Sequence, residues 1–182
     1  NHNWGSPNGE VLFRAEEYSH TGYGTNVFVA LERPDEVWVD DDWDGPDNCG
    51  GHSWGYNAFA SIQEGIDAVQ GSTAHVAAGT YVEQLHITMD DLDIIGAGVG
   101  QTIIQSPATL TEFFGTNYPV VFVDGCTGVD ISGVTIDGDG QGNANYRFCG
   151  IAFWNAGGSL TDAEVLNVMD TPFSGAQHGI GI

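Results

Sequence analysis

The chain has 182 residues, 41% of them hydrophobic and 27 of them glycine, which is enough for one domain with a core and too apolar for a disordered chain. With 6 prolines and no Gly-X-Y period, collagen is excluded. The 25 Asp and Glu residues outnumber 3 basic residues, all Arg, for a formal net charge of −22. This charge repels nucleic acid and anionic membranes, and no apolar run reaches the roughly 20 residues of a transmembrane helix. Neither nucleic-acid binding nor membrane insertion is therefore expected, whereas cations are expected to screen the surface.

The first part of the chain, residues 1–36, is polar and rich in turn residues, and it is interpreted as an N-terminal extension. It is either the end of a preceding repeat or an assembly strand. One strand is predicted in it, Thr25–Leu31, with Thr25, Val27 and Val29 alternating along one face. A short strand at Val37–Val39 follows and enters an acidic run.

One helix is predicted, at Ser61–Val69. Ser61 and Glu64 have the S-x-x-E spacing of a capping box, and Gly71 ends the segment. Apolar residues recur at intervals of three and four, which places them on one helical face, at Phe59, Ile62, Ile66 and Val69.

After Gly71 the sequence predicts only short strands, separated by Gly, Asp and Asn. They are expected at Ala74–Ala77, Gln84–Ile87, Leu92–Ile95, Thr102–Gln105, Val120–Val123, Val129–Ile136, Gly150–Trp154, Ala163–Val168 and Gly179–Ile182. Asp-Gly pairs such as Asp124-Gly125 are typical of hairpin turns, so an antiparallel sandwich is the alternative.

A repeat favours stacked coils over the sandwich. Val121-x-Val123, Ile151-x-Phe153 and Ile180-x-Ile182 recur at a spacing of about 30 residues, and Val134-x-Ile136 is echoed by Leu166-x-Val168. A period of this length without helices suits a solenoid whose strands stack in register. The fold class expected is thus all-β, a parallel β-helix over residues 37–182, truncated at its C-terminal end and capped by the helix Ser61–Val69.

Several segments in this order resemble secreted right-handed parallel β-helix proteins of the pectin-lyase-like superfamily. They are Val37-Trp-Val-Asp-Asp-Asp-Trp43, Phe59-Ala-Ser-Ile-Gln-Glu-Gly-Ile-Asp-Ala-Val69, Val76-Ala-Ala-Gly-Thr-Tyr-Val-Glu-Gln84 and Leu92-Asp-Ile-Ile-Gly-Ala-Gly98. The resemblance implies the fold and a secreted or cell-surface location. It does not imply one activity, because this fold carries lyases, hydrolases, esterases and adhesins. The opening Asn3-Trp-Gly-Ser-Pro-Asn-Gly9 resembles a motif that closes such β-helices, which suggests a longer tandem protein.

A calcium site is predicted in the acidic run. Asp40, Asp42, Asp44 and Gly45 match the first half of an oxygen-rich calcium loop, with Asn48 at its ninth position. The twelfth position is Gly51, so the loop lacks the closing Glu of an EF-hand. A second acidic turn contains Asp137 and Asp139, and in both places the alternative is a solvated turn.

A ligand groove is predicted on adjacent coils. Polysaccharide chemistry needs carboxylates that face each other beside aromatic rings, and the candidates are Asp137, Asp139, Tyr146, Trp154, Asp170, Gln177 and His178. The alternative is that Phe153 and Trp154 belong to the core and its rim.

Other reactive residues show no motif. The histidines lack the spacing of metal ligands, so His52, His75 and His86 are each interpreted as structural, as are the remaining isolated histidines. Cys49, Cys126 and Cys149 allow one pair and leave one over, and their pairing stays open. The resemblance to pectin methylesterase covers Ala78–Glu83 and Ile94–Gly98. The Gln-Asp-Thr and Asp-Phe-Ile-Phe-Gly segments of that enzyme's catalytic region have no counterpart, so no catalytic residue is assigned.

The leading functional hypothesis is an extracellular, non-catalytic β-helix module for surface architecture, adhesion or filament assembly, stabilised by calcium. The alternative is a polysaccharide lyase or glycoside hydrolase whose active groove lies mostly beyond this chain. Head-to-tail self-association is predicted through the Thr25–Leu31 strand and the open coil end at Ile180 and Ile182, because an uncovered coil leaves main-chain hydrogen-bonding groups free.

Overall fold

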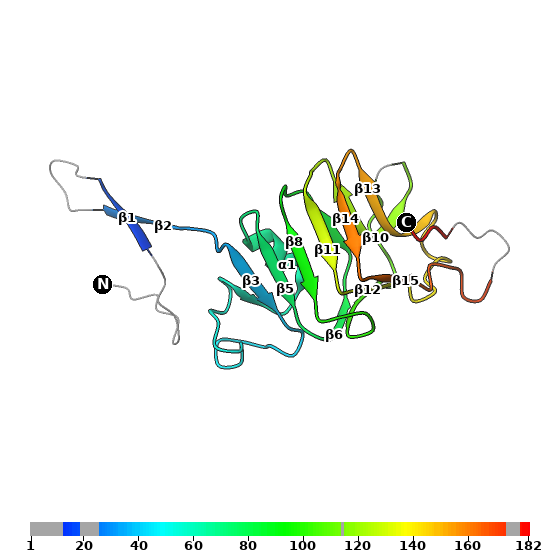
Figure 1. The fold of residues 1–182 in the computed structure, drawn as a ribbon, viewed down its shortest axis with the longest axis horizontal. Helices are drawn as coiled ribbons and strands as arrows, with labels where there is room; N and C mark the ends of the chain where they lie inside the picture. Colours follow the sequence, from blue (N-terminus) through cyan, green and yellow to red (C-terminus); the bar gives the residue numbers. More distant parts are fainter. Residues whose placement is uncertain (1–12, 19–25, 114, 174–178) are drawn as a thin grey trace.

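The computed structural model describes residues 13–18, 26–113, 115–173 and 179–182. In this part of the chain an antiparallel hairpin precedes a solenoid of three parallel sheets that contains one short helix, α1 (Figure 1). The described residues contain no helix that is long and apolar enough to cross a membrane.

From Leu85 onward each turn of the solenoid contributes one strand to each of three sheets, whereas the earlier solenoid strands join only the second and third. We number the sheets for reference. The first sheet consists of β7 (Leu85–Ile87), β10 (Tyr118–Asp124) and β13 (Phe148–Trp154). The second sheet has the order β4 (Ala58–Phe59), β3 (Glu36–Val39), β5 (Thr73–Val76), β8 (Asp93–Gly96), β11 (Val129–Ser132) and β14 (Gly158–Thr161). The third sheet consists of β6 (Gly79–Val82), β9 (Thr102–Gln105), β12 (Thr135–Asp137) and β15 (Glu164–Leu166).

The strands of these three sheets pair in parallel, which confirms the β-helix and excludes the sandwich alternative. β10 pairs with β7 on one side and with β13 on the other, and it makes no hairpin with β11. The predicted strand Val129–Ile136 is two strands, β11 and β12. Gly133 makes the corner between them with φ of +67°, and an added Cβ there would lie 2.7 Å from the Gly96 carbonyl oxygen of the coil below.

The helix covers one end of the stack. α1 (Ile62–Ala68) begins after Ser61, whose Oγ accepts a hydrogen bond from the Glu64 amide at 3.4 Å. The main cap comes from Glu83, at the end of the Ala-Gly-Thr-Tyr-Val-Glu segment. Its carboxylate accepts hydrogen bonds from the amides of Ile62 (2.8 Å) and Gln63 (2.9 Å) and from Ser61 Oγ (2.9 Å). The helix and the Ala-Gly-Thr-Tyr-Val-Glu segment, two separate motifs in the sequence, thus contact each other through Glu83.

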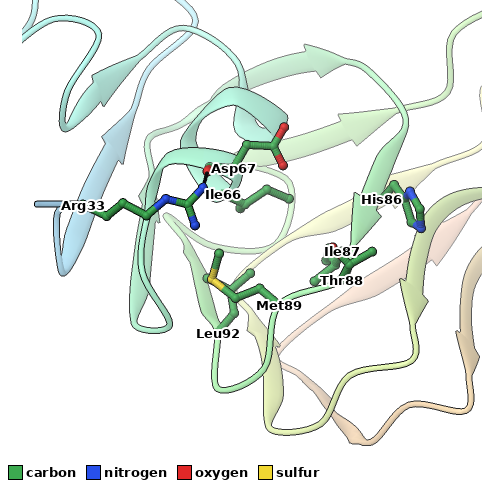
Figure 2. A pocket seen from close by; sticks show the side chains of 8 residues that line it. All are labelled: Arg33, Ile66, Asp67, His86, Ile87, Thr88, Met89 and Leu92. Atoms are coloured by element: carbon green, nitrogen blue, oxygen red, sulfur yellow. Dashed lines mark hydrogen bonds between the residues drawn. The ribbon is translucent and has the colours of Figure 1, made fainter. Parts of the chain in front are cut away.

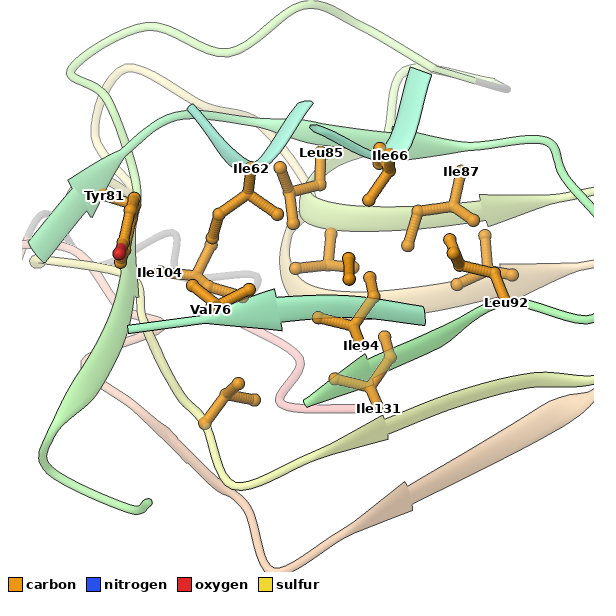
Figure 3. Close-up of a cluster of buried hydrophobic side chains, with 14 of the residues drawn as sticks. Ile62, Ile66, Val76, Tyr81, Leu85, Ile87, Leu92, Ile94, Ile104 and Ile131 are labelled. Atoms are coloured by element: carbon orange, nitrogen blue, oxygen red, sulfur yellow. The ribbon is translucent and has the colours of Figure 1, made fainter. Parts of the chain in front are cut away.

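The core runs along the inside of the coils. Inward side chains stack at the strand positions Leu85, Ile87, Ile94, Ile104 and Ile131, each at most 1% exposed, and Ile62 and Ile66 of α1 close the stack (Figure 3). Tyr81 also points inward, and its hydroxyl donates to the carbonyl oxygens of Val39 and Ala77, at 3.3 and 3.2 Å. Burial, with the nearby Asp41 charge, raises the pKa of Tyr81.

The predicted repeat is right for one coil and wrong for others. Val121 pairs with Ile151 and Val123 with Phe153, as predicted. Ile180 pairs with Cys149 and not with Ile151. Ile136 pairs with Val165, which places Leu166 opposite Asp137 and not opposite Val134. The number of residues in the turns varies from coil to coil, so sequence spacing alone does not set the register.

The hairpin gives the N-terminal extension its structure. β1 (Phe13–Tyr18) and β2 (Asn26–Leu31) pair antiparallel, from Phe13 opposite Leu31 to Tyr18 opposite Asn26. The described part of the predicted strand Thr25–Leu31 therefore pairs with β1 of the same chain, outside the coil repeat. Val27 and Val29 pair with Glu17 and Ala15, whereas Thr25 lies outside the described residues.

Candidate functional site

A histidine–carboxylate pair lies on the outer face of the first sheet. Strand alternation buries Leu85 and Ile87 and turns His86 outward from β7. His86 Nε2 lies 3.3 Å from Asp124 Oδ2 at the end of β10, and each side chain is 38% exposed. The pair is open to solvent, so it is accessible to a ligand.

Aromatic rings surround His86. The Phe122 ring, from the neighbouring strand position, stacks on the imidazole with centroids 5.4 Å apart. Phe113, from the loop before β10, packs on both rings, at 4.7 Å from Phe122 and 4.6 Å from His86. Trp154 ends β13 opposite Asp124 and is 39% exposed. We refer to these five residues as the first-sheet face.

The loop that carries Phe113 is held by two side-chain amides. Gln84 accepts from the Thr111 amide at 2.8 Å and donates to the carbonyl oxygens of Thr111 and Pro119. Asn145, only 1% exposed, accepts from the Leu110 amide at 2.9 Å. These contacts order the loop before any ligand arrives, which lowers the entropic cost of binding.

Gln63 of α1 fixes the open edge of β7. Its amide oxygen accepts from the His86 backbone N–H at 2.8 Å, and its Nε2 donates to the His86 carbonyl oxygen at 3.1 Å. The side chain thus occupies the position that a further strand would take. It fixes the backbone from which the His86 imidazole projects.

Two hollows flank this face. One, with a volume of about 330 Å³, lies between α1 and the end of β7 and is lined in part by Arg33, Asp67 and Met89 (Figure 2). Arg33 donates to the carbonyl oxygen of Asp67 at 2.6 Å, so it caps the helix C-terminus. The other hollow, of about 120 Å³, lies above Ala152 between Phe122 and Trp154. Its lining is mostly aromatic and aliphatic.

The groove predicted from sequence is not assembled as expected. Asp137 ends β12, and Asp170 lies in the turn of the next coil, where it bridges to Gln141 in the turn after β12. Trp154 is at the far end of β13 from that turn, about 20 Å away at the usual rise of roughly 3.3 Å per residue. Gln177 and His178 lie outside the described residues. The aromatic and the acidic residues that were predicted to line one groove therefore lie apart.

The acidic residues predicted to bind calcium make turn contacts. Asp40 accepts from the Asp42 amide at 3.0 Å, and Asn48 donates to the Asp42 carbonyl oxygen and to Asp44 Oδ1. In the second turn Asp137 accepts from the Asp139 amide at 2.8 Å. The residues that the structure describes include no group of three or more His, Cys, Asp or Glu side chains arranged to hold a metal ion.

Asp41 lies within the acidic run but outside the predicted calcium pattern of Asp40, Asp42 and Asp44, and it attaches the run to the solenoid. Asp41 accepts a hydrogen bond from the Thr80 amide at 3.1 Å, and an added Cβ on Gly79 would collide with its carboxylate. This contact attaches the acidic loop to the third sheet. The glycine of Ala-Gly-Thr-Tyr was the signal in the sequence, but the bonded residues Asp41 and Thr80 are 39 positions apart.

The remaining predictions concern the cysteines and the C-terminal coil. Cys49, Cys126 and Cys149 are buried thiols, and none forms a disulfide. Burial raises the pKa of Cys126 and of Cys149. Ile180 is 49% exposed and Ile182 is 78% exposed, and self-association through them stays a prediction.

The comparisons with known proteins identify the fold. No family model matches the chain, and no curated protein matches it. A solved pectin methylesterase in complex with hexasaccharide VII is similar at a TM-score of 0.52 and 14% identity, over 70% of this chain and 42% of that one. A pectin methylesterase from carrot is similar at a TM-score of 0.51 and 15% identity, over 81% of this chain and 40% of that one. A pectin methylesterase mutant in complex with hexasaccharide IV is similar at a TM-score of 0.50 and 11% identity, over 71% of this chain and 48% of that one.

These likenesses, together with the three parallel sheets, define the fold as a right-handed parallel β-helix. The chain spans less than half the length of the pectin methylesterases it matches. At this level of identity the likeness establishes the fold alone.

Proposed function

We propose that the chain is part of an extracellular polysaccharide-binding β-helix protein and that the polymer lies across the first-sheet face. The observation that carries this proposal is the exposed His86–Asp124 pair beside the accessible rings of Phe113 and Trp154, which Phe122, only 5% exposed, supports from beneath. Aromatic rings pack against the C–H groups of sugars, and an imidazole with a carboxylate binds hydroxyl groups. Two of the similar structures contain hexasaccharides, which supports the same ligand class here.

The same pair supports catalysis as a second candidate. An imidazole within hydrogen-bonding distance of a carboxylate is an arrangement that serves general acid–base chemistry. The likeness to carbohydrate-active enzymes favours this polysaccharide-active alternative over a purely architectural role. The proposal places the protein outside the cell, where its charge of −22 is screened by salt.

Calorimetry of the chain with neutral and acidic hexasaccharides tests the proposal. We expect Trp154→Ala or Phe113→Ala to weaken binding about fivefold to tenfold, as loss of an aromatic contact does. Phe173→Ala is the matched control, because Phe173 is 70% exposed and lies in the turn that carries Asp170. Equal affinity of all three variants would contradict the proposed face.

Catalysis has its own test. If His86 acts on substrate, His86→Gln abolishes release of reducing ends from a polysaccharide while hexasaccharide binding persists. If the unmodified chain binds hexasaccharide but releases no reducing ends, the binding role stands and the catalytic role is contradicted.

A further inference from the structure

A second cluster of rings lies on the outer face of the second sheet. Trp38 of β3 is stacked between two imidazoles, His52 at 4.1 Å and His75 of β5 at 5.4 Å, with interplanar angles of 16° and 21°. Trp43 packs on the other side of His52 at 5.9 Å. The first-sheet face uses none of these residues.

A groove of about 390 Å³ runs beside this cluster, and we call it the Trp38 groove. Its far wall is the corner at Gly96 and Ala97, and its floor includes Ile95, which is 41% exposed. Among the described residues that line it none is acidic, although the chain has 25 Asp and Glu residues. The volume lies within the range of small-molecule sites.

The walls of the groove are held in place. Gly50 has φ of +61°, and an added Cβ there would lie 2.8 Å from the Trp43 ring, so only glycine lets that ring close on the loop. On the opposite wall, the Ala97 amide donates to Thr102 Oγ1 at 2.8 Å. His75 is oriented by Glu36, at 3.6 Å from its Nε2. The groove therefore exists before a ligand binds.

We propose that the Trp38 groove binds an uncharged saccharide, independently of the first-sheet face. The indole N–H groups are donors, and the imidazole nitrogens other than His75 Nε2, which faces Glu36, can donate or accept according to tautomer, which matches a ring of hydroxyl groups. Ile95 and the aromatic rings provide apolar surface for the sugar's C–H groups. An uncharged ligand avoids the repulsion that a polyanion meets from a chain of net charge −22. The ligand class rests on the proposed function, whereas the groove rests on its own geometry.

The tryptophans allow one experiment to separate the two sites. Trp38 and Trp43 line the groove, Trp154 lies on the first-sheet face, and Trp54 lies on neither. The indole N–H signals of the ¹⁵N-labelled chain, assigned by single Trp→Phe substitutions, are followed while cellohexaose is added. A parallel titration uses hexagalacturonate as the acidic probe.

We expect cellohexaose to shift the Trp38 and Trp43 signals in a saturable way and to leave Trp54 unchanged. Trp43→Phe keeps a ring but removes the N–H, and it should weaken this binding about fivefold, as loss of one hydrogen bond does. Trp54→Phe is the matched control and should have no effect. Hexagalacturonate should bind the groove more weakly than cellohexaose.

Shifts of Trp154 without shifts of Trp38 or Trp43 would overturn this inference and leave the proposed function intact. Shifts of Trp38 and Trp43 alone would support the groove and contradict the first-sheet face. If neither probe moves any of these signals, both proposals fail for these sugars and the groove inference is rejected.

Discussion

The contact between Glu83 and the start of α1 makes a quantitative prediction about stability. Glu83→Ala removes three hydrogen bonds of 2.8 to 2.9 Å to a carboxylate, two of them from helix amides. A hydrogen bond to a charged group contributes about 1.5–3 kcal/mol, and water partly replaces these contacts at a half-buried site, so we expect a loss of about 2–4 kcal/mol. For a chain of this size that is a fall in Tm of about 5–15 °C.

Thermal unfolding followed by circular dichroism, with chemical denaturation at one temperature, measures this loss. Glu64→Gln is the matched control, since Glu64 is an exposed acid in the same first turn and interacts only with the helix dipole, a contribution of about 0.3–1 kcal/mol. Ser61→Ala should fall between the two, near 1 kcal/mol. The reasoning is refuted if Glu83→Ala costs no more than Glu64→Gln, because the carboxylate would then not be the main helix cap.

Further outcomes follow from other residues. Ile131→Ala, at a fully buried position, should destabilise the chain by about 2–5 kcal/mol, whereas Val99→Ala, at an exposed one, should cost little in the same denaturation experiment. Burial and the neighbouring His75 lower the pKa of His52. Its contribution to stability is therefore present above the unfolded value of 6.5 and is lost as the pH falls toward the lower folded value; His52→Phe should flatten this part of the stability–pH curve. If calcium binds at Asp40, Asp42 and Asp44 as predicted, a chelator lowers the Tm. An unchanged Tm would show that this loop is a turn without a calcium site. Light scattering with calcium present tests self-association, and a monomer at high concentration would reject the contact through Ile180 and Ile182.

Local patterns determined much of the fold. The helix Ser61–Val69 agrees with α1 and its cap residues Ser61 and Val69, because an N-cap serine and an apolar period act within a few residues. The stronger cap, Glu83, lies 22 positions from Ser61 and was not predicted. The strand Thr102–Gln105 agrees with β9 residue for residue. β6 (Gly79–Val82) and β14 (Gly158–Thr161) were missed, because each begins with a glycine and only one residue of β6 is buried.

The sites depended on contacts that sequence distance hides. His86 and Asp124 are 38 positions apart, and neither belongs to a local motif, so sequence reasoning assigned His86 to a structural role. The Trp38 groove likewise joins β3, β5 and a loop. Conversely, Trp154 and Asp170 are close in sequence, yet Asp170 bridges to Gln141 in the turn before β13, and Trp154 lies at the other end of that seven-residue strand.

The sequence by itself therefore determined the type of fold, through a repeat of about 30 residues, and its capping helix, through an apolar period of three to four residues. Only the tertiary structure decided which side chains share a face, because that depends on the strand register. Turns of unequal length set the register, as the corrected pairings of Ile136 and Ile180 illustrate.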